Sequence, residues 1–373
     1  MKTLQGRDEE GDGYIVIAKK ASDEQVLEKL LDFAFKRTLS LLEKGEDPYL
    51  EIPVRTRDTI VYDEEKDMVL LKRVLAKRNF LNIGKVRKFT QTLAIAATIA
   101  ELLTRHKHAQ LRDVFYNRAY LFKDQRESDG IIEDLAAALG VCREALNVIA
   151  SAKGVCVGQI KIRDRGDVID CSKLGTGGWS ITPLVDEIEF VDCKAEFVLV
   201  VEKDAAFFRL VEDRFWEKYK CLLVTGKGQA DIATRRFVKR LREELGLPVF
   251  ILVDSDPYGF YIASVYKRGS ISLSFDTPRL ATKDAKLLGL LPSDLDKYKV
   301  PKYARLKMTE ADLKRLREIR RYPWYQREEY QREFDIMEKR GEKAEIQALC
   351  AHGLTYLTDK YLPTKLERQD WLD

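Results

Sequence analysis

Three acidic residues follow strand-like apolar runs in the second half of the chain. Glu202 comes directly after EFVLVV, and Asp254 and Asp256 come directly after PVFILV. Burying ionised carboxylates is costly unless they are paired or bind a metal, although Asp, Ser, Pro and Gly in DSDPYG are also typical of a turn. Three carboxylates that meet at one place would suit Mg²⁺, which uses a few hard oxygen ligands and keeps room for water and phosphate.

The surrounding elements predict that these carboxylates do meet. The continuous apolar runs EFVLVVEKD, KCLLVTGKG and PVFILVDSD are each followed by an amphipathic stretch. This alternation is typical of a parallel sheet covered by helices on both faces, whose sites lie outside the carboxyl ends of the strands. We therefore expect a magnesium site at one sheet edge, with Lys203 and Lys227 beside it as candidate phosphate contacts. The alternative for both lysines is an ordinary solvated side chain.

Neither of two glycine-rich segments matches a nucleotide-binding loop. VTGKGQAD lacks the GxxxxGK[ST] pattern, and GTGGWS is too short to indicate such a loop. This chain is therefore not expected to bind ATP.

The net charge of +4 is distributed unevenly. Residues 1–70 carry 11 Lys/Arg against 17 Asp/Glu, whereas residues 72–126 carry 13 against 3. A basic block of this density suits contact with nucleic-acid phosphates, although a solvated basic face has the same composition. The candidate DNA contacts in and near this block are Lys85, Arg87, Lys88, Arg118 and Arg143.

The pattern after the basic block predicts a DNA-binding fold. In DGIIEDLAAALGVCREALNVIASAKG a helix is expected to end near Leu139, Gly140 to form a turn, and a second helix to begin near Arg143. VCVGQIKIRDRGDVIDC then alternates like a β-hairpin, in the position of a wing. We therefore predict a winged helix over residues 73–172, with a generic αα-hairpin as the alternative.

Composition argues against several other classes. The chain is 45% hydrophobic and 34% charged, its first residues include no apolar signal segment, and no run approaches the roughly 18 apolar residues of a membrane span. A cytoplasmic protein without a membrane partner is expected. The six cysteines have no zinc-like spacing, and the presence of only three histidines argues against a His-rich metal site.

Taken together, these segments resemble a known family. VVEKDAAF and DSDPYG are similar to the Toprim domain of topoisomerases and primases. With RDVFY upstream, they resemble the A subunit of topoisomerase VI, the archaeal type IIB enzyme, and the related meiotic protein that makes double-strand breaks. The segments IPVRT, RNFLNIGKVRKFTQTLAIA, GGWSI, TGKGQAD and IQALCAHGLTYLTDKYLPTKL extend the match along most of the chain.

The resemblance implies a DNA-cleaving isomerase and assigns roles to its residues. It places the nucleophile, which becomes linked to a 5′ phosphate of double-stranded DNA, on Tyr116, with Arg112 beside it. The family often has two adjacent tyrosines here, whereas this chain has Phe115 before Tyr116, and Tyr120 is the remaining rival. Glu202 is expected to act as acid/base as well as metal ligand.

The resemblance also implies partners and a domain order. It implies a homodimer in which the tyrosine of one protomer meets the Toprim site of the other. ATP-dependent strand passage requires a second, ATP-binding subunit, the ATPase of the complex, giving an A2B2 heterotetramer. The predicted fold class is α/β plus α+β: residues 1–72 form an arm that docks the partner, 73–172 the winged helix, and 173–373 a Toprim domain with a helical C-terminal extension.

Several functions stay open at this point. Besides a nucleoid-associated topoisomerase in the cytoplasm, the sequence is compatible with a meiotic-type protein that makes double-strand breaks without strand passage. A Mg²⁺-dependent Toprim nuclease, in which water attacks and Tyr116 is structural, is a second alternative. A winged-helix DNA binder without catalytic activity is a third.

Overall fold

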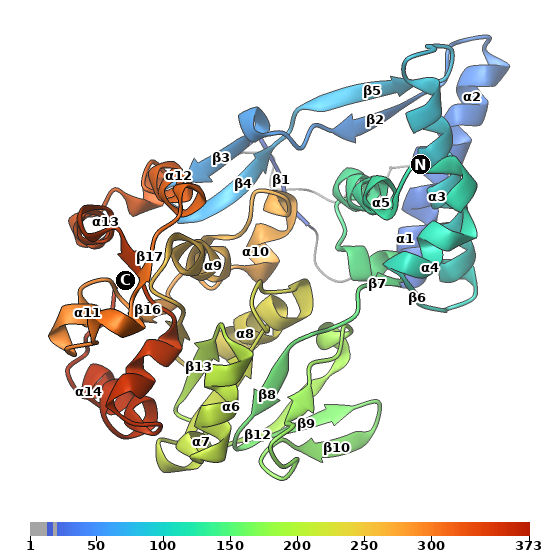
Figure 1. Ribbon diagram of the computed structural model, residues 1–373. Coiled ribbons are helices and arrows are strands. Elements are labelled where there is room, and N and C mark those ends of the chain that lie inside the picture. Colours follow the sequence, from blue (N-terminus) through green and yellow to red (C-terminus); the bar gives the residue numbers. More distant parts are fainter. Residues whose placement is uncertain (1–12, 18–20) are drawn as a thin grey trace. The chain divides into compact units, whose positions relative to one another are not determined.

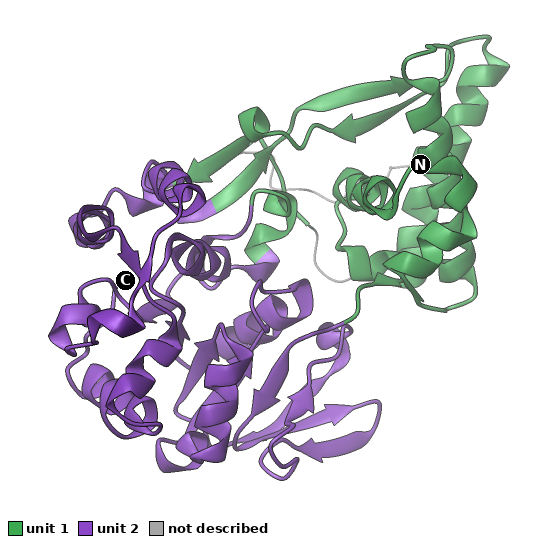
Figure 2. Ribbon diagram, in the orientation of Figure 1, with its two compact units in different colours: residues 1–63, 69–151, 271–278 green, residues 64–68, 152–270, 279–373 purple. Residues whose placement is uncertain are grey.

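The computed structural model describes residues 13–17 and 21–373, which form two compact units (Figures 1 and 2). Unit 1 comprises the described residues up to 63 together with 69–151 and 271–278. Unit 2 comprises residues 64–68, 152–270 and 279–373. The predicted division at residues 72 and 172 differs from this one, because the N-terminal segment packs with the basic block in unit 1.

Unit 1 is mainly helical. Its helices are α1 (Asp23–Leu30), α2 (Arg37–Glu43), α3 (Val86–Thr104), α4 (Leu111–Asn117) and α5 (Gln125–Leu139). Its strands are β1 (Tyr14–Ile15), β2 (Tyr49–Pro53), β3 (Ile60–Asp63), β4 (Met68–Lys72, of which Met68 belongs to unit 2), β5 (Leu75–Asn79), β6 (Ala109–Gln110) and β7 (Val148–Ile149). β2 pairs with β5, β1–β4–β3 form a small sheet, and β6 pairs with β7.

The core of unit 1 lies between α1, α3 and α5. Val26 and Leu30 of α1 and Ile99 of α3 are fully buried in it. The N-terminal segment of unit 1 is helical: Ser22 caps α1, a π-helical turn joins α1 to α2, and Gly45 follows with a positive φ of 72°. Residues 21–43 are therefore part of the folded core.

The predicted pair of helices around Gly140 forms only in part. α5 ends at Leu139, and Gly140 adopts the left-handed conformation with a φ of 64°, as expected for a helix stop. The second helix is a single 3₁₀ turn, Arg143–Leu146, because Asn147 turns left-handed and the chain enters β7. The expected hairpin does form, from β9 (Ile160–Asp164) and β10 (Asp167–Asp170), but it belongs to unit 2.

Unit 2 is built on a six-stranded sheet of order β11–β8–β14–β13–β15–β16. The strands of unit 2, inside and outside this sheet, are β8 (Val155–Val157), β9 (Ile160–Asp164), β10 (Asp167–Asp170), β11 (Trp179–Ser180), β12 (Glu189–Cys193), β13 (Phe197–Val201), β14 (Cys221–Thr225), β15 (Val249–Leu252), β16 (Lys286–Gly289), β17 (Leu306–Lys307) and β18 (Glu342–Lys343). The strands β14, β13, β15 and β16 are parallel, which confirms the predicted parallel sheet and adds β16 to it. β9, β10 and β12 form a separate three-stranded sheet.

Helices connect and cover this sheet. They are α6 (Asp204–Glu212), α7 (Phe215–Lys218), α8 (Ile232–Leu245), α9 (Pro257–Arg268), α10 (Thr277–Leu280, which begins in unit 1), α11 (Asp294–Lys297), α12 (Glu310–Ile319), α13 (Glu328–Arg340) and α14 (Leu362–Glu367). Leu199 and Val201 of β13 share a core with α6 and with Leu349 and Leu362 of the helical C-terminal extension. None of the helices in the described part of the chain is long and apolar enough to cross a membrane.

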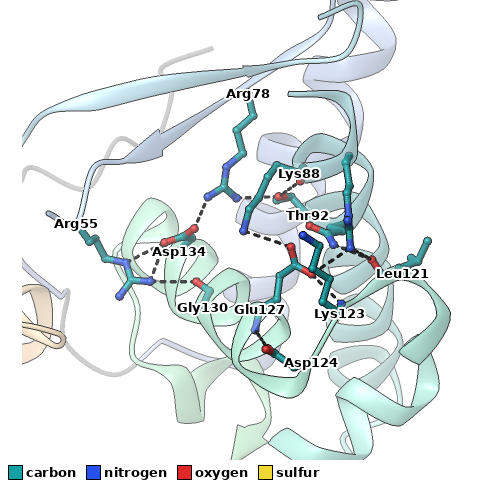
Figure 3. Close-up of polar contacts among 12 residues, drawn as sticks. Arg55, Arg78, Lys88, Thr92, Leu121, Lys123, Asp124, Glu127, Gly130 and Asp134 are labelled. Carbon is teal, nitrogen blue, oxygen red and sulfur yellow. Dashed lines mark hydrogen bonds and ion pairs between the residues drawn. The ribbon is translucent and has the colours of Figure 1, made fainter. Parts of the chain in front are cut away.

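Asp134 of α5 ties the β2 and β5 region to the helices of unit 1 (Figure 3). Its carboxylate accepts a hydrogen bond from Nε of Arg55 at 2.8 Å and forms a second ion pair with Arg78 of β5. Arg78 also donates to Oγ1 of Thr92 on α3 at 2.8 Å. The three charged side chains are only 13–16% exposed.

Asp134→Asn is therefore expected to destabilise unit 1 by about 2–4 kcal/mol, because it removes the negative charge that Arg78 faces and one of the two carboxylates that pair with Arg55, which keeps Glu133. The measurement is the denaturant midpoint of unfolding. Glu101→Gln is the control, since the Glu101–Arg105 pair is exposed and contributes little. Equal midpoints for the two variants would contradict the prediction.

Candidate functional site

The carboxyl ends of β13 and β15 bring the predicted acidic residues to one edge of the sheet of unit 2. Val201 is in register with Leu252, and the Glu202 N–H donates to the Leu252 carbonyl at 2.9 Å. Glu202 and Asp254 thus leave neighbouring parallel strands side by side. Glu202 Oε2 in turn accepts a hydrogen bond from the Asp254 N–H at 2.9 Å.

Burial raises the pKa of Glu202 to about 7, and the negative charges of Asp254 and Asp256 act in the same direction. The backbone hydrogen bond from Asp254 and the charge of Lys203 oppose this rise. Near neutral pH the Glu202 carboxyl is therefore divided between its neutral and charged forms. A group with this property can give up or take a proton, or bind a cation.

Asp254 is held by a segment close to the C-terminus. Its Oδ1 accepts the Ile346 N–H at 2.8 Å, and Ser255 forms a two-bond β-bridge with Ala344. Only 9% of Asp254 is exposed, and burial raises its pKa. Sequence reasoning missed this contact, because nothing in the local pattern links residues 254 and 346.

The sequence left a turn and an acidic site as alternatives for DSDPYG, and Asp256 takes part in both. Its Oδ1 accepts the Gly259 N–H at 2.7 Å and caps α9, with Pro257 in the first turn. Burial also raises the pKa of Asp256. Gly259 is required here, since a Cβ would lie 2.2 Å from the Asp254 carbonyl oxygen.

The three carboxylates offer a suitable donor set for a hard divalent cation. Each uses one oxygen to accept a backbone N–H, and the second oxygen of each is the atom that a cation would take. Across the described residues, no group of three His, Cys, Asp or Glu side chains is gathered closely enough to hold a metal ion. The donor chemistry fits Mg²⁺, and side-chain movement is needed to complete the ligand set.

Tyr116 lies on the exposed face of α4 in unit 1. Val114 is buried and Phe115 half-buried against the core, whereas the Tyr116 side chain is 61% exposed. The Arg112 guanidinium lies over the Tyr116 ring, 5.6 Å from its centroid, as their spacing of one helical turn predicts. Tyr120 is also exposed but follows the end of α4, on the 3₁₀ turn Ala119–Leu121.

The predicted DNA contacts of unit 1 differ in their availability. Lys85 is exposed at the start of α3. Arg87 and Lys88 lie 3.3 and 4.0 Å from the Glu127 carboxylate, which partly neutralises them (Figure 3 shows Lys88 and Glu127). Arg143 is only 11% exposed and pairs with Glu144 at 3.0 Å. We therefore leave Arg143 out of the DNA surface.

Three further basic residues complete the predicted contacts. Arg118 is half-buried at the end of α4, close in sequence to Tyr116. Lys203 contacts Glu345 at 2.6 Å and Asp254 at 3.6 Å, and these charges raise its pKa against the effect of burial. Lys227 lies 3.6 Å from Asp204. The last two side chains are thus engaged with carboxylates beside the acidic edge.

Family models match three consecutive parts of the chain. The models are a type IIB DNA topoisomerase model over residues 87–148, an all-beta domain in DNA topoisomerase VI alpha subunit over 153–194, and the Toprim domain of the topoisomerase 6 A subunit and Spo11 over 197–366. The type 2 DNA topoisomerase 6 A subunit of Hyperthermus butylicus is 42% identical over 363 residues, covering 91% of this chain and 94% of the relative. The chain belongs to the family of topoisomerase VI A subunits.

Other members of this family are similarly close. The DNA topoisomerase 6 A subunit of Arabidopsis thaliana is 45% identical over 329 residues, 88% of this chain and 77% of the relative. The Pyrococcus abyssi protein is 40% identical over 360 residues, 92% and 94% respectively. The all-beta match contains the β9–β10 hairpin, so this hairpin lies outside the region matched by the N-terminal type IIB model. Its predicted role as the wing of residues 73–172 is not confirmed.

The raised pKa of Glu202 predicts a pH-dependent stability. The folded state binds the Glu202 proton more tightly than the unfolded state, so the metal-free protein loses stability as pH rises from 4.5 to about 7. Glu202→Gln keeps an oxygen for the Asp254 N–H and cannot ionise. At pH 8 in EDTA it should be more stable than the parent by about 1–3 kcal/mol, with little difference at pH 4.5.

Thermal unfolding of both proteins across this pH range is the measurement. Glu65→Gln, at an exposed position, is the matched control. A constant difference between Glu202→Gln and its parent at every pH would show that Glu202 titrates normally.

Proposed function

We propose that this chain is the DNA-cleaving and religating subunit of an ATP-dependent type IIB topoisomerase. The observation that carries the proposal is that Tyr116 is exposed and lies under the Arg112 guanidinium. Membership of the family and the acidic edge of unit 2 support it. The proposed nucleophile is Tyr116, which would form a bond from its phenolic oxygen to a DNA phosphorus while the bond to the 3′ oxygen breaks. A 5′-phosphotyrosyl end and a free 3′ hydroxyl result, and the reverse step religates the strand.

Arg112 is proposed to stabilise charge rather than to accept a proton. An ordinary tyrosine is only about 0.1% phenolate at pH 7, and Arg stays protonated in proteins. The guanidinium over the ring would stabilise the negative charge that develops on the phosphate during attack. The Tyr116 proton must therefore pass to a group other than Arg112.

Glu202 is proposed to exchange the proton of the 3′ oxygen, because its pKa of about 7 allows both forms near neutral pH. In cleavage the neutral carboxyl would donate to the leaving oxygen, and in religation the carboxylate would take that proton back. Mg²⁺ held by Glu202, Asp254 and Asp256 would supply positive charge beside the phosphate. A cation bound to Glu202 would lower the pKa of its carboxyl group. Glu202 would therefore act as metal ligand and as proton donor at different stages of the reaction.

Double-stranded DNA would be held by exposed basic side chains, with Lys85, Arg87, Lys88 and Arg118 as the proposed contacts of unit 1. Lys203 and Lys227 are proposed to meet phosphates near the acidic edge, after release from their carboxylate partners. We further propose that the helices of unit 1 bind this DNA as a winged-helix domain does. Each phosphate contact makes binding more sensitive to salt.

Two protomers are needed to cut both strands, and we propose a homodimer in which Tyr116 of one protomer serves the acidic edge of its partner. An ATPase subunit would complete an A2B2 assembly and drive strand passage at the nucleoid in the cytoplasm. Relatives named as A subunits of DNA topoisomerase 6 favour this function over that of a break-forming protein without strand passage.

Tyr116→Phe should abolish covalent attachment of the protein to DNA, because only the nucleophilic oxygen is removed from an exposed side chain. The assay is a denaturing gel of supercoiled plasmid incubated with this chain, its ATPase partner and Mg²⁺, then stopped with SDS. Tyr120→Phe is the matched control and should leave attachment intact. Cleavage with protein-free ends that survives Tyr116→Phe would instead identify a metal-dependent nuclease.

The N-terminal segment is our proposed docking site for the ATPase subunit, and the structure dictates how to test it. Deleting residues 1–45 would remove Val26, Leu30 and Ala34 from the core of unit 1. Leu39 and Leu42 of α2, by contrast, are 58% and 51% exposed. Leu39 and Leu42 lie three residues apart and so share one face of α2, where their exposed apolar surface suits a protein contact.

The double variant Leu39→Ser/Leu42→Ser should weaken co-purification with the ATPase subunit at least tenfold, which corresponds to about 1.4 kcal/mol. Leu354→Ser, at a position that is 68% exposed in unit 2, is the control. The readout is the amount of ATPase subunit retained on the tagged chain. Unchanged retention in the double variant would place the docking site elsewhere.

A further inference from the structure

The ammonium group of Lys203 lies between two carboxylates at the acidic edge. Its Nζ is 2.6 Å from Glu345 Oε2 and 3.6 Å from Asp254 Oδ2. Lys203 directly follows Glu202, and Glu345 directly precedes Ile346, whose N–H holds Asp254. The segments that carry Glu202 and Ile346 therefore both build the acidic edge and place a positive charge beside it.

Lys203 contacts the oxygen of Asp254 that the backbone leaves available. Asp254 Oδ1 accepts the Ile346 N–H at 2.8 Å, and this bond does not involve Lys203. The side chain of Asp254 therefore keeps its orientation when Lys203 moves away. Its Oδ2 is the atom that either an ammonium group or a divalent cation would contact, and like charges at one oxygen repel each other.

The ion pairs of Lys203 can be exchanged easily. The pair that must open, Lys203–Asp254, is the longer of the two at 3.6 Å, and its lysine is 32% exposed although the Asp254 side chain is only 12% exposed. The lysine stem is flexible and ends in a compact charge. Lys343, also near the edge, is engaged by Asp312 at 2.7 Å. Lys203 is thus the better placed of these two lysines to exchange with a metal ion.

We propose that Lys203 is an exchangeable counter-cation that occupies Asp254 until a divalent cation arrives and then withdraws to Glu345. The exchange deepens the proposed function and rests on it, since it requires the edge to bind Mg²⁺. It couples metal binding to DNA binding, because the Lys203 ammonium group leaves Asp254 and can contact a phosphate from its position beside Glu345. Glu345 serves as its anchor in the metal-bound state.

The test is calorimetric titration of the full-length chain with Mg²⁺ in the absence of DNA. Lys203→Met keeps most of the stem and should tighten Mg²⁺ binding about three- to tenfold, because the competing charge is gone. Lys203→Arg keeps the charge and should bind Mg²⁺ like the parent. Lys220→Met is the matched control. Lys220 forms an exposed pair with Glu196 where β14 and β13 begin, at the end of the sheet opposite the acidic edge.

Glu345→Gln tests the anchor and should act in the opposite direction. Without Glu345, Lys203 stays on Asp254, and Mg²⁺ binding should weaken about threefold or more. In the Lys203→Met background most of this loss should disappear, which a double-mutant cycle measures directly. A loss of equal size in both backgrounds would overturn the anchor role, because Glu345 would then act on the cation itself.

Two outcomes separate this inference from the proposed metal site. If Mg²⁺ binds and Glu202→Gln abolishes binding while Lys203→Met leaves the affinity unchanged, the exchange is overturned and the metal site stands. If the parent chain and Glu202→Gln both fail to bind Mg²⁺ at millimolar concentrations, the metal site and the exchange are overturned together. Thermal unfolding of each variant confirms that it is folded.

Discussion

The hydrogen bond from the Ile346 N–H to Asp254 joins the C-terminal extension to the acidic edge of the sheet. A carboxylate at the end of a buried parallel strand is costly, and this bond together with the Ser255–Ala344 bridge holds it in place. The extension is itself anchored by Leu349 and Leu362 in the core beneath α6. The position of Asp254 therefore depends on apolar packing by residues that are distant in the sequence.

The same edge concentrates more negative charge than its surroundings neutralise. Glu202, Asp254 and Asp256 all have raised pKa values, with burial as the main cause in each case. Such an arrangement costs stability in the absence of a cation, and unfavourable charge clusters of this kind are common at functional sites. The backbone donors restrain each carboxylate in a separate way, which keeps the three groups apart.

The parallel sheet and the acidic edge were predictable because their signals are local. Apolar runs ending in Glu202 and Asp254, with helical stretches between them, indicate both the strands and the edge where the carboxylates lie. Tyr116 was different: it is one of 16 tyrosines, and only the family resemblance selected it, after which the helical spacing to Arg112 was confirmed. Its exposure gives no ground for choosing it over Tyr120, which is exposed as well. Contacts between distant segments, such as the Ile346 bond and the Glu345–Lys203 pair, depend on how the C-terminal extension folds back, and no short motif encodes that path.

The side chains that contact the Tyr116 ring determine what help it would have as the proposed nucleophile. Its ring packs against Phe115 and under Arg112, and neither side chain can accept the phenolic proton. The positive charge of Arg112 can stabilise negative charge that develops on a phosphate, but Arg112 cannot take the phenolic proton. For the proposed attack, the phenolic proton therefore needs an acceptor supplied by another residue of this chain, by the partner protomer or by the substrate.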